Sequence, residues 1–378
     1  MHIAFLTPEY PHPKIGKSGG LGTSIWGLAN ILSESGINVT VLVYGKEKDS
    51  SFREDGVNFY LIRNIKVKGL SYFLTVKKVQ KLIIRINKDD KIDFLEVPDW
   101  TGFSAFLKLN IPIVMRLNGS DSYFCHLENR PVKIFNKFLE RRAFRRADHI
   151  ISVSKFTGEL TNKLFNLQRS FEIIPNPVDT SKFSNFSNSI QSGVILYFGT
   201  LIRKKGLLEL PFIFNEVVNV FPDTRLYLVG SDSFDIITGS TSTWQLMEPL
   251  FSEAALKNVK YFGPVDYSAI KNHIARANLC VFPSFAEALP VSWLEAMAMG
   301  KAIVTSDVGW APEIIDQGQD GFMVDPKNHK EFAERICQIL QYQDLQESLS
   351  KNAIHKVNSK FSKQSVFQRY ISYYNSLV

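Results

Sequence analysis

Residues 279–299 read LCVFPSFAEALPVSWLEAMAM, and this stretch points to the architecture of the chain. Its first four residues are apolar and too few for a helix, so they predict a short buried strand. A loop follows over 283–290. Pro290 suits the start of a helix over 291–299 because its missing N–H would have no intrahelical partner there. A buried strand that leads through a loop into a helix is typical of a parallel α/β sheet.

The same alternation of short apolar runs and longer helix-period segments extends in both directions along the chain. Because strands that alternate with helices form parallel sheets, the pattern predicts an α/β protein with doubly wound sheets. The predicted strands are 2–6, 38–44, 93–97, 112–117 and 150–153 in a first series, and 194–198, 225–229, 279–282 and 302–305 in a second. The predicted helices are 23–35, 207–220, 291–299 and 331–340.

Two prolines and a polar Ser/Asn-rich stretch, within residues 174–192, separate the two series. This composition is typical of a linker, so we place a domain boundary near residue 185. The length of 378 residues also favours two domains. In such sheets ligands bind outside the carboxyl ends of the strands, and we therefore look for functional residues directly after strands.

The composition, 45% hydrophobic and 21% charged, is that of a globular protein and argues against disorder. No apolar run is long enough to span a bilayer, and the N-terminus lacks the basic region of a signal peptide. The three cysteines, Cys125, Cys280 and Cys337, are widely spaced and form no CxxC motif. We therefore expect no disulfide framework and no zinc site, and we predict a cytoplasmic protein.

Charge is distributed unevenly along the chain. Residues 1–185 carry 27 Lys and Arg against 18 Asp and Glu, residues 186–350 carry 12 against 19, and residues 351–378 carry 5 against none. This asymmetry predicts that one face meets an anionic partner, for which nucleic acid, an anionic membrane surface and a phosphorylated substrate are candidates.

Two loops after predicted strands have the composition of anion-binding sites. Residues 16–22 contain four glycines and Lys17 ahead of the first helix, where backbone N–H groups can approach an anion. Residues 197–206 place Arg203, Lys204 and Lys205 at a strand-to-helix junction of the acidic half. Arginine binds phosphate as a fork and lysine as a point charge, so this second loop also predicts phosphate binding.

Two glutamates mark the quoted stretch. Glu287 lies in the loop after the strand, where it can accept hydrogen bonds from sugar-like hydroxyls, and the helix N-terminus beside it can face a diphosphate. Glu295 lies on the second turn of a largely apolar helix and needs a partner if it is buried. Ribose hydroxyls would supply that partner, whereas an exposed helical glutamate is the alternative.

Glu287 and Glu295, with seven residues between them, resemble the E-x7-E signature of retaining GT-B glycosyltransferases, specifically the large glycosyltransferase family 4. The resemblance covers nearly the whole chain. Residues 17–21 resemble the KxGGL loop of glycogen synthases and their relatives, 198–206 the FxGRLxxxKG motif, 176–179 the interdomain N-G/P-V-D, 228–231 the strand end before the nucleotide loop, and Gly309, Pro312-Glu313 and 320–322 the GG-x-PE and NGxxV elements.

The resemblance implies a GT-B fold, in which two Rossmann-like doubly wound parallel-sheet domains face a central cleft. Residues 1–185 would bind the acceptor, residues 186–360 would bind the NDP-sugar, and residues 361–378 would form a helix that crosses back to the first domain. Lys205 would hold the donor diphosphate with help from Arg203, Glu287 would contact the transferred sugar, and Glu295 would bind the ribose. The other implied donor contacts are Gly19, Gly20, Gly199, Gly263, Val265, Leu289, Pro290 and Val291.

Three residues depart from the family pattern. Thr200 stands in place of the usual arginine, so the cations that follow must replace its charge. Trp310 replaces a glycine. Asn118 replaces the usual histidine and cannot titrate, so it cannot be a general base. We retain Asn118 as a catalytic-site residue that exchanges hydrogen bonds.

Two further features bear on mechanism. The chain has no Asp-x-Asp, so we expect no divalent metal and no other cofactor, with the leaving nucleotide neutralised by cations and helix N-termini. Retention without an obvious nucleophile resembles the front-face, substrate-assisted route.

Residues after strands of the first half are candidate acceptor contacts, and for the two aspartates helix capping is an equal alternative. These residues are Glu96, Asp99, Trp100 and Asp121. Two basic stretches, 66–85 with interleaved apolar residues and 141–146, suggest docking on an anionic leaflet, although a solvated helix face explains them equally well. No nucleic-acid-binding module is evident.

The sequence thus predicts a retaining glycosyltransferase that acts on a saccharide or lipid-linked saccharide acceptor, in the cytoplasm or peripherally on the inner leaflet. Three alternatives stay open. They are a soluble-acceptor transferase, a UDP-sugar 2-epimerase of the same fold, and a non-catalytic nucleotide-sugar-binding protein, which would bind nucleotide without turnover.

Overall fold

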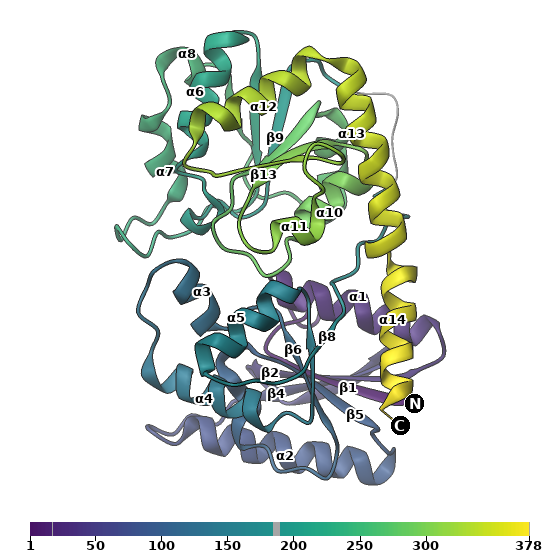
Figure 1. The fold of residues 1–378 in the computed structure, drawn as a ribbon. Coiled ribbons are helices and arrows are strands. Elements are labelled where there is room, and N and C mark those ends of the chain that lie inside the picture. The colour runs from purple at the N-terminus through teal and green to yellow at the C-terminus, as the bar shows by residue number, and fades with distance from the viewer. Residues whose placement is uncertain (17, 184–189, 378) are drawn as a thin grey trace. The chain divides into compact units, whose positions relative to one another are not determined.

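The computed structural model describes residues 1–16, 18–183 and 190–377, and it divides the chain into two compact units (Figure 1). Unit 1 comprises Met1–Pro177 and Lys363–Val378, and unit 2 comprises Val178–Ser362. The division thus falls at Pro177, before the boundary expected near 185. The Val178 N–H donates to the Phe361 carbonyl at 2.9 Å, and this hydrogen bond ties the segment to unit 2. Residues 184–189 of the expected linker lie outside the described ranges.

Unit 1 is built on an eight-stranded sheet of order β3-β4-β2-β1-β5-β6-β7-β8. Its strands are β1 (His2–Thr7), β2 (Asn38–Lys46), β3 (Ser50–Glu54), β4 (Val57–Arg63), β5 (Phe94–Pro98), β6 (Ile113–Leu117), β7 (His149–Ser152) and β8 (Glu172–Ile173). All neighbours are parallel except β3 and β4. These two form a hairpin through Asp55-Gly56, both at positive φ, which is a favoured two-residue turn. The all-parallel expectation is therefore wrong at this edge.

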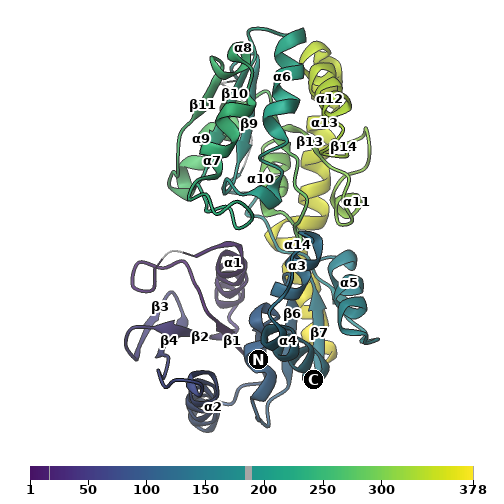
Figure 2. The same ribbon diagram turned by 90° about the vertical axis from the view of Figure 1, so that its left-hand side faces the viewer.

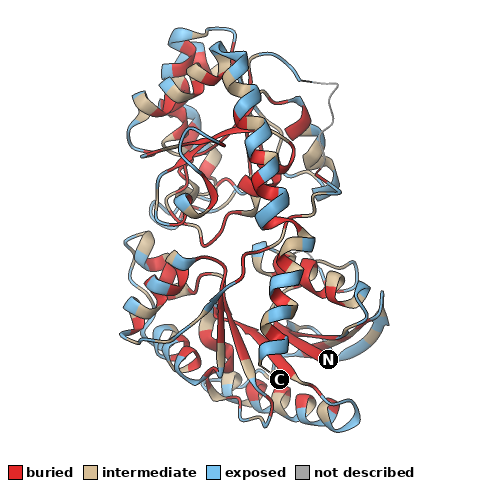
Figure 3. Ribbon diagram, turned by 45° about the vertical axis from the view of Figure 1, so that its right-hand side comes forward, coloured by how far each residue is buried: buried red, intermediate tan, exposed pale blue. Residues whose placement is uncertain are grey.

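The helical segments of unit 1 cover both faces of its sheet. They are α1 (Gly20–Glu34), α2 (Ser71–Asp89), η1 (Trp100–Phe106), α3 (Asp121–Leu127), α4 (Ile134–Arg146), α5 (Lys155–Phe165) and α14 (Lys363–Ser376). Alternate residues of β1 point to opposite faces. Ile3 and Phe5 pack with α1 and α14, whereas Ala4 and Leu6 pack with α2 and α4. Figure 1 shows these helices beside the sheet, and Figure 3 shows the sheet strands largely in the colour of buried residues.

Unit 2 has a six-stranded, fully parallel sheet of order β11-β10-β9-β12-β13-β14. Its strands are β9 (Val194–Phe198), β10 (Arg225–Val229), β11 (Val259–Tyr261), β12 (Leu279–Phe282), β13 (Ala302–Ser306) and β14 (Phe322–Val324). Its helical segments are η2 (Arg203–Lys205), α6 (Leu210–Val220), α7 (Thr243–Met247), η3 (Glu248–Leu250), α8 (Glu253–Leu256), α9 (Tyr267–Arg276), α10 (Val291–Ala298), α11 (Ala311–Ile314), α12 (His329–Gln341), α13 (Gln343–Lys356) and η4 (Val357–Phe361). Helices α6 and α12 lie side by side (Figure 2).

The nine predicted strands are all present, each within two residues of its expected bounds. The quoted stretch forms β12, a loop and α10, with Pro290 as the residue before the helix. Because every pair of neighbouring strands in unit 2 is parallel, the loops that follow β9 and β12 both begin at the same edge of the sheet. The two candidate loops of unit 2 therefore meet.

Candidate active site

The loops after β9 and β12 contact each other through their backbones. The N–H groups of Phe285 and Ala286 both donate to the Lys204 carbonyl, at 2.8 and 3.2 Å. Gly206, with φ +70°, permits this approach, because a Cβ there would stand 1.8 Å from the Pro283 carbonyl oxygen. The two loops are thus held in one arrangement.

We expect Gly206→Ala to destabilise the protein by about 2–3 kcal/mol and to cost more than Gly239→Ala. Both glycines have positive φ, +70° and +78°, so both variants incur the strain of the left-handed region. Only at position 206 does the new Cβ meet backbone, whereas nothing lies within 4 Å of it at position 239. Thermal unfolding measures both, and equal losses would contradict the loop contact.

Lys205 and Glu287 form an ion pair between these loops, with Nζ 3.2 Å from Oε1. Their side chains are 21% and 14% exposed, so a ligand can still reach them. Gly199 lies beside the ammonium group, because a Cβ there would stand 3.4 Å from Nζ. A cation and a carboxylate held together suit a ligand that carries both an anionic group and hydroxyls.

Glu295 lies on α10 and is almost fully buried, with 5% of its surface exposed. Its carboxylate accepts a hydrogen bond from the hydroxyl of Tyr267, at the start of α9. Burial raises the pKa of Glu295 to about 7, against the opposing effects of this hydrogen bond and of the Lys205 charge. The predicted need for a partner is confirmed, because Tyr267 donates to one of the two carboxylate oxygens. The ribose contact of Glu295 stays a prediction.

Tyr267→Phe is expected to destabilise unit 2 by about 1.5–3 kcal/mol at pH 8 and by much less at pH 5. At pH 8 the Glu295 carboxyl, with its pKa of about 7, is ionised and loses its donor, whereas at pH 5 it is protonated. Since this pKa lies above the ordinary 4.5, the folded state holds a proton that the unfolded chain releases between about pH 4.5 and 7. The stabilisation from this proton is present below pH 4.5 and is lost as the pH rises through 7.

Urea unfolding at the two pH values measures this difference. Tyr342→Phe is a matched control, because Tyr342 is about as exposed as Tyr267, at 54% against 48%, and its hydroxyl makes no hydrogen bond within the described part of the chain. A destabilisation by Tyr267→Phe that does not change with pH would show that Glu295 is not the group involved.

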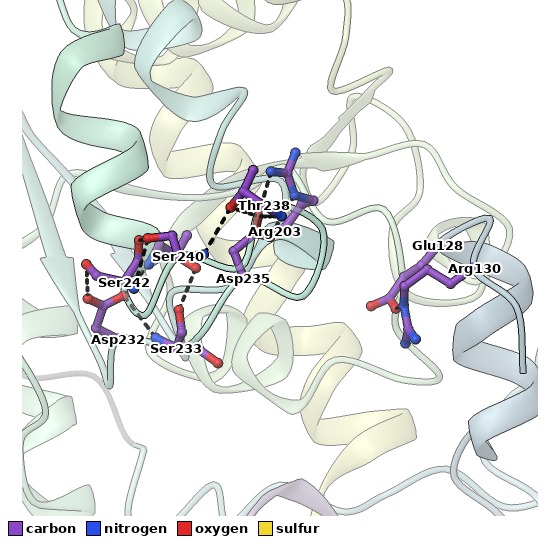
Figure 4. A network of polar contacts seen from close by, with 10 residues as sticks. Glu128, Arg130, Arg203, Asp232, Ser233, Asp235, Thr238, Ser240 and Ser242 are labelled. Atoms are coloured by element: carbon purple, nitrogen blue, oxygen red, sulfur yellow. Dashed lines mark hydrogen bonds and ion pairs between the residues drawn. The ribbon is translucent and has the colours of Figure 1, made fainter. Parts of the chain in front are cut away.

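Arg203 corrects one expectation from the sequence. Its Nε and Nη2 both donate to the Asp235 carboxylate, at 2.8 Å each. Asp235 is buried and also accepts from the N–H and hydroxyl of Thr238. The Arg203 guanidinium, followed by the Thr238 donors, holds the pKa of Asp235 well below its usual range. Arg203 thus anchors the loop after β10 (Figure 4), and its guanidinium pairs with Asp235 where the sequence predicted a donor diphosphate. In the same loop, Asp232 accepts from the backbone N–H groups of Thr243 and Trp244.

Three glycines pack the backbone at this edge. The Gly230 N–H donates to the Gly263 carbonyl at 2.9 Å, and a Cβ at Gly230 would stand 1.9 Å from the Gly199 carbonyl oxygen. Of these three glycines, Gly199 and Gly263 are predicted donor contacts. Of the remaining predicted contacts, Leu289 and Pro290 are buried, while Val265 and Val291 are half-buried.

In unit 1 the glycine-rich loop holds a carboxylate of the chain itself. Glu9, just after β1, accepts from the N–H groups of Gly19 and Gly22 at 3.1 and 2.9 Å. The amide of Gly19 is therefore taken, which corrects its expected approach to a diphosphate. Gly20, the first residue of α1, is exposed, and nothing lies within 4 Å of a Cβ built there. Lys17 lies outside the described residues.

Asp99 positions the loop after β6. Its buried carboxylate accepts from the N–H groups of Asn118 and Gly119, both at 3.1 Å, and burial raises the pKa of Asp99 to about 7. Asp99 stands at the N-cap position of η1, but its side chain makes no capping hydrogen bond, so the predicted capping role is wrong. Because the carboxylate is buried, the predicted acceptor contact is wrong as well. The Asn118 Oδ1 lies 3.4 Å from the Asn176 amide nitrogen, and its own buried Nδ2 has no hydrogen-bond partner within the described part of the chain.

Glu96 is wrongly predicted as an acceptor contact. It is buried on β5, where Arg116 donates to Oε1 at 2.7 Å and the Tyr370 and Tyr374 hydroxyls donate to Oε2 at 2.5 and 2.6 Å. Because these donors come from β6 and α14, the carboxylate joins these two elements in the core of unit 1. A ligand cannot reach it there.

The other two candidate acceptor contacts differ from each other. Trp100 is 39% exposed at the start of η1. Asp121 accepts from the Asn136 side chain at 2.9 Å. The cap of α3 is Ser120, whose hydroxyl oxygen accepts from the Tyr123 N–H, so Asp121 is not the capping residue.

Sequence reasoning missed three residues of these sites, namely Glu9, Asp235 and Tyr267. Glu9 had a usable signal, because it follows a strand in the same way as the other carboxylates considered. Tyr267 had none, since it precedes Glu295 by 28 residues on a different helix.

The family models for "Glycosyltransferase Family 4" and "Glycosyl transferases group 1" match residues 18–182 and 180–356 respectively. Together with the two parallel-sheet units and the E-x7-E loop, these matches identify the class. The chain belongs to the group 1, family 4 glycosyltransferases of GT-B fold.

Individual relatives agree with this class. An uncharacterised glycosyltransferase of Methanocaldococcus jannaschii is 27% identical, over 99% of this chain and 98% of its own length. The N,N'-diacetylbacillosaminyl-diphospho-undecaprenol alpha-1,3-N-acetylgalactosaminyltransferase of Campylobacter jejuni is 34% identical, over 56% of this chain and 52% of its own. The crystal structure of Anabaena HepE in complex with UDP has the same fold, with a TM-score of 0.76, 18% identity and full coverage of both chains.

Proposed function

We propose that this chain is a retaining glycosyltransferase that moves a sugar from an NDP-sugar, with UDP or GDP as the nucleotide, to a hydroxyl of a saccharide or lipid-linked saccharide. Its product would belong to surface polysaccharide or glycoconjugate biosynthesis. The observation that carries the proposal is the Lys205–Glu287 ion pair, built on loops that contact through their backbones and adjoin the buried Glu295.

In this proposal Lys205 carries the electrostatic part of the reaction. Its ammonium group neutralises the charge that develops on the leaving diphosphate, and a preorganised cation in a partly dry site is effective in that role. Glu287 accepts hydrogen bonds from hydroxyls of the transferred sugar. With Arg203 held by Asp235, Lys205 and the start of α10 remain as the proposed counter-charges, and we propose that no divalent metal is required.

We propose a front-face displacement. The bond between the anomeric carbon and the leaving phosphate oxygen breaks, and the acceptor oxygen bonds to the same face of that carbon. The acceptor proton passes to the leaving phosphate oxygen. Asn118, which lies after β6, has no titratable group and would exchange hydrogen bonds only.

The proposal of a UDP donor is supported by the fold shared with HepE, whose structure holds UDP. The proposal of a lipid-linked acceptor is supported by the Campylobacter relative, whose name specifies a diphospho-undecaprenol substrate. No helix in the described part of the chain is long and apolar enough to cross a membrane. We propose that the enzyme works in the cytoplasm, peripherally on the inner leaflet.

A donor screen tests the function. The purified protein is incubated with UDP-, GDP- and ADP-sugars, and released nucleotide and thermal shift are measured, with Glu287→Ala alongside. We expect slow release from one donor, lost in the variant. If no donor binds, the proposal is wrong. If a donor binds but neither water nor any saccharide or lipid-linked acceptor yields turnover, the non-catalytic alternative is favoured.

A further inference from the structure

Unit 1 carries a continuous aromatic cluster that reaches its surface and has no role in the site described above. Phe73 of α2 contacts Phe106 of η1, with ring centroids 5.2 Å apart, and Phe106 contacts Phe138 of α4 at 6.4 Å. Tyr72 contacts Phe135 of α4 at 6.0 Å. We call these five residues the aromatic face. The ring contacts join α2, η1 and α4 into one surface.

Much of this face is open to solvent. Phe135 and Phe138 are each 51% exposed, and Ile134 at the start of α4 is 87% exposed. Leu70 and Phe73, where α2 begins, are also exposed. Exposed apolar side chains are normal when scattered singly, but adjoining ones mark a surface that binds something.

The segments that carry the face are strongly basic. Residues 56–88 contain eight Lys and Arg and no Asp or Glu, and residues 129–146 contain seven with Glu140 as the one acid. Glu140 is buried and accepts from the backbone N–H groups of Asp121 and Ser122, so it does not offset this charge at the surface. Lys77, Lys81 and Arg85 line a groove of about 730 Å³ between α2 and the β3–β4 hairpin.

We propose that the aromatic face, with its basic surroundings, docks unit 1 on an anionic lipid bilayer. Exposed phenylalanine and isoleucine side chains would enter the boundary between headgroups and acyl chains, and the flanking cations would bind anionic headgroups. Charge complementarity favours this occupant, because the segments that carry α2 and α4 are rich in Lys and Arg and the Arg142 guanidinium lies 4.4 Å from the ring centroid of Phe106. This docking would bring unit 1 to the bilayer that holds a lipid-linked acceptor. Only this link to the acceptor rests on the proposed function.

Vesicle sedimentation tests the proposal with the full-length chain. We expect the protein to pellet with phosphatidylcholine vesicles that contain about 30% phosphatidylglycerol and to stay in solution with phosphatidylcholine alone. Phe135→Ser/Phe138→Ser should lower the partition coefficient at least about tenfold. Lys77→Gln/Lys81→Gln should lower it several-fold, with the difference from the wild type vanishing at high salt.

Val220→Ser/Tyr342→Ser is the matched control, because both of its residues are exposed apolar side chains of unit 2. It should bind vesicles as the wild type does. Equal vesicle binding by Phe135→Ser/Phe138→Ser and by the wild type would overturn the proposal. Wild-type binding that does not depend on phosphatidylglycerol would overturn it as well. A concentration-dependent dimer that the phenylalanine variant loses, seen by light scattering, would instead assign the face to a second copy.

No sugar donor enters this measurement. Its failure would therefore leave the transferase proposal intact, and a donor screen without binding would not affect the docking result.

Discussion

Lys205→Ala is expected to lower kcat/KM for the NDP-sugar by about 10²–10³-fold, the usual cost of removing one preorganised charge-stabilising group. Nζ of Lys205 lies 3.2 Å from Glu287 at the edge where the loops after β9 and β12 meet, so it is placed for an anionic leaving group. Steady-state release of nucleotide, with and without acceptor, measures the effect. We expect most of it in kcat, because the charge on the phosphate increases toward the transition state.

Two controls separate this chemistry from folding. Lys330→Ala removes an exposed lysine elsewhere in unit 2 and should leave kcat/KM unchanged. Lys205→Ala/Glu287→Gln removes both charges, so no unpaired carboxylate remains, and it should stay as inactive as the single variant. Activity within tenfold of the wild type in Lys205→Ala would mean that another group stabilises the leaving nucleotide.

Glu96→Ala is expected to destabilise unit 1 by about 3–5 kcal/mol, the cost of breaking a buried ion pair. The variant leaves the Arg116 guanidinium buried without its carboxylate, and it leaves the Tyr370 and Tyr374 hydroxyls without their acceptor. Because both tyrosines lie on α14, the helix should detach from the sheet first. Urea unfolding followed by circular dichroism measures the loss of stability.

Tyr373→Phe is the matched control for this network. Tyr373 lies on the same helix, is half-buried, and its ring contacts Tyr374. We expect it to cost less than about 1 kcal/mol, since its hydroxyl lies outside the Glu96 network. A similar loss in Glu96→Ala and Tyr373→Phe would mean that the ion pair does not hold α14.

The strands were predictable because a buried parallel strand is a local apolar run between turns. Residues 194–198, 225–229 and 279–282 match β9, β10 and β12 without any shift. The β3–β4 hairpin was missed, although Asp55-Gly56 is a recognisable turn pair. The unit boundary was misplaced because the Val178 hydrogen bond to Phe361 spans most of unit 2 and leaves no local trace.

Some residues of the candidate site were likewise predictable from local sequence, and others were not. Glu287, Glu295 and Lys205 were found from spacing and from their place after strands, and the structure brings Lys205 and Glu287 together. Arg203 and Glu96 were assigned to ligands because a cation or carboxylate near a strand end has no visible partner in the sequence. Their partners, Asp235 and Arg116, are 32 and 20 residues away.

Local pattern therefore determines the strand–loop–helix units, the E-x7-E loop and the positions where a ligand could bind. Only tertiary packing decides which of those charged groups remain available. Glu9 accepts hydrogen bonds from amides of the glycine-rich loop, and Tyr267 donates one to Glu295. Tyr370 donates a hydrogen bond to Glu96, which lies 274 residues away in the sequence. The physical reason is that burying a charge requires a partner, and the nearest donor is set by how sheets and helices pack and not by distance along the chain.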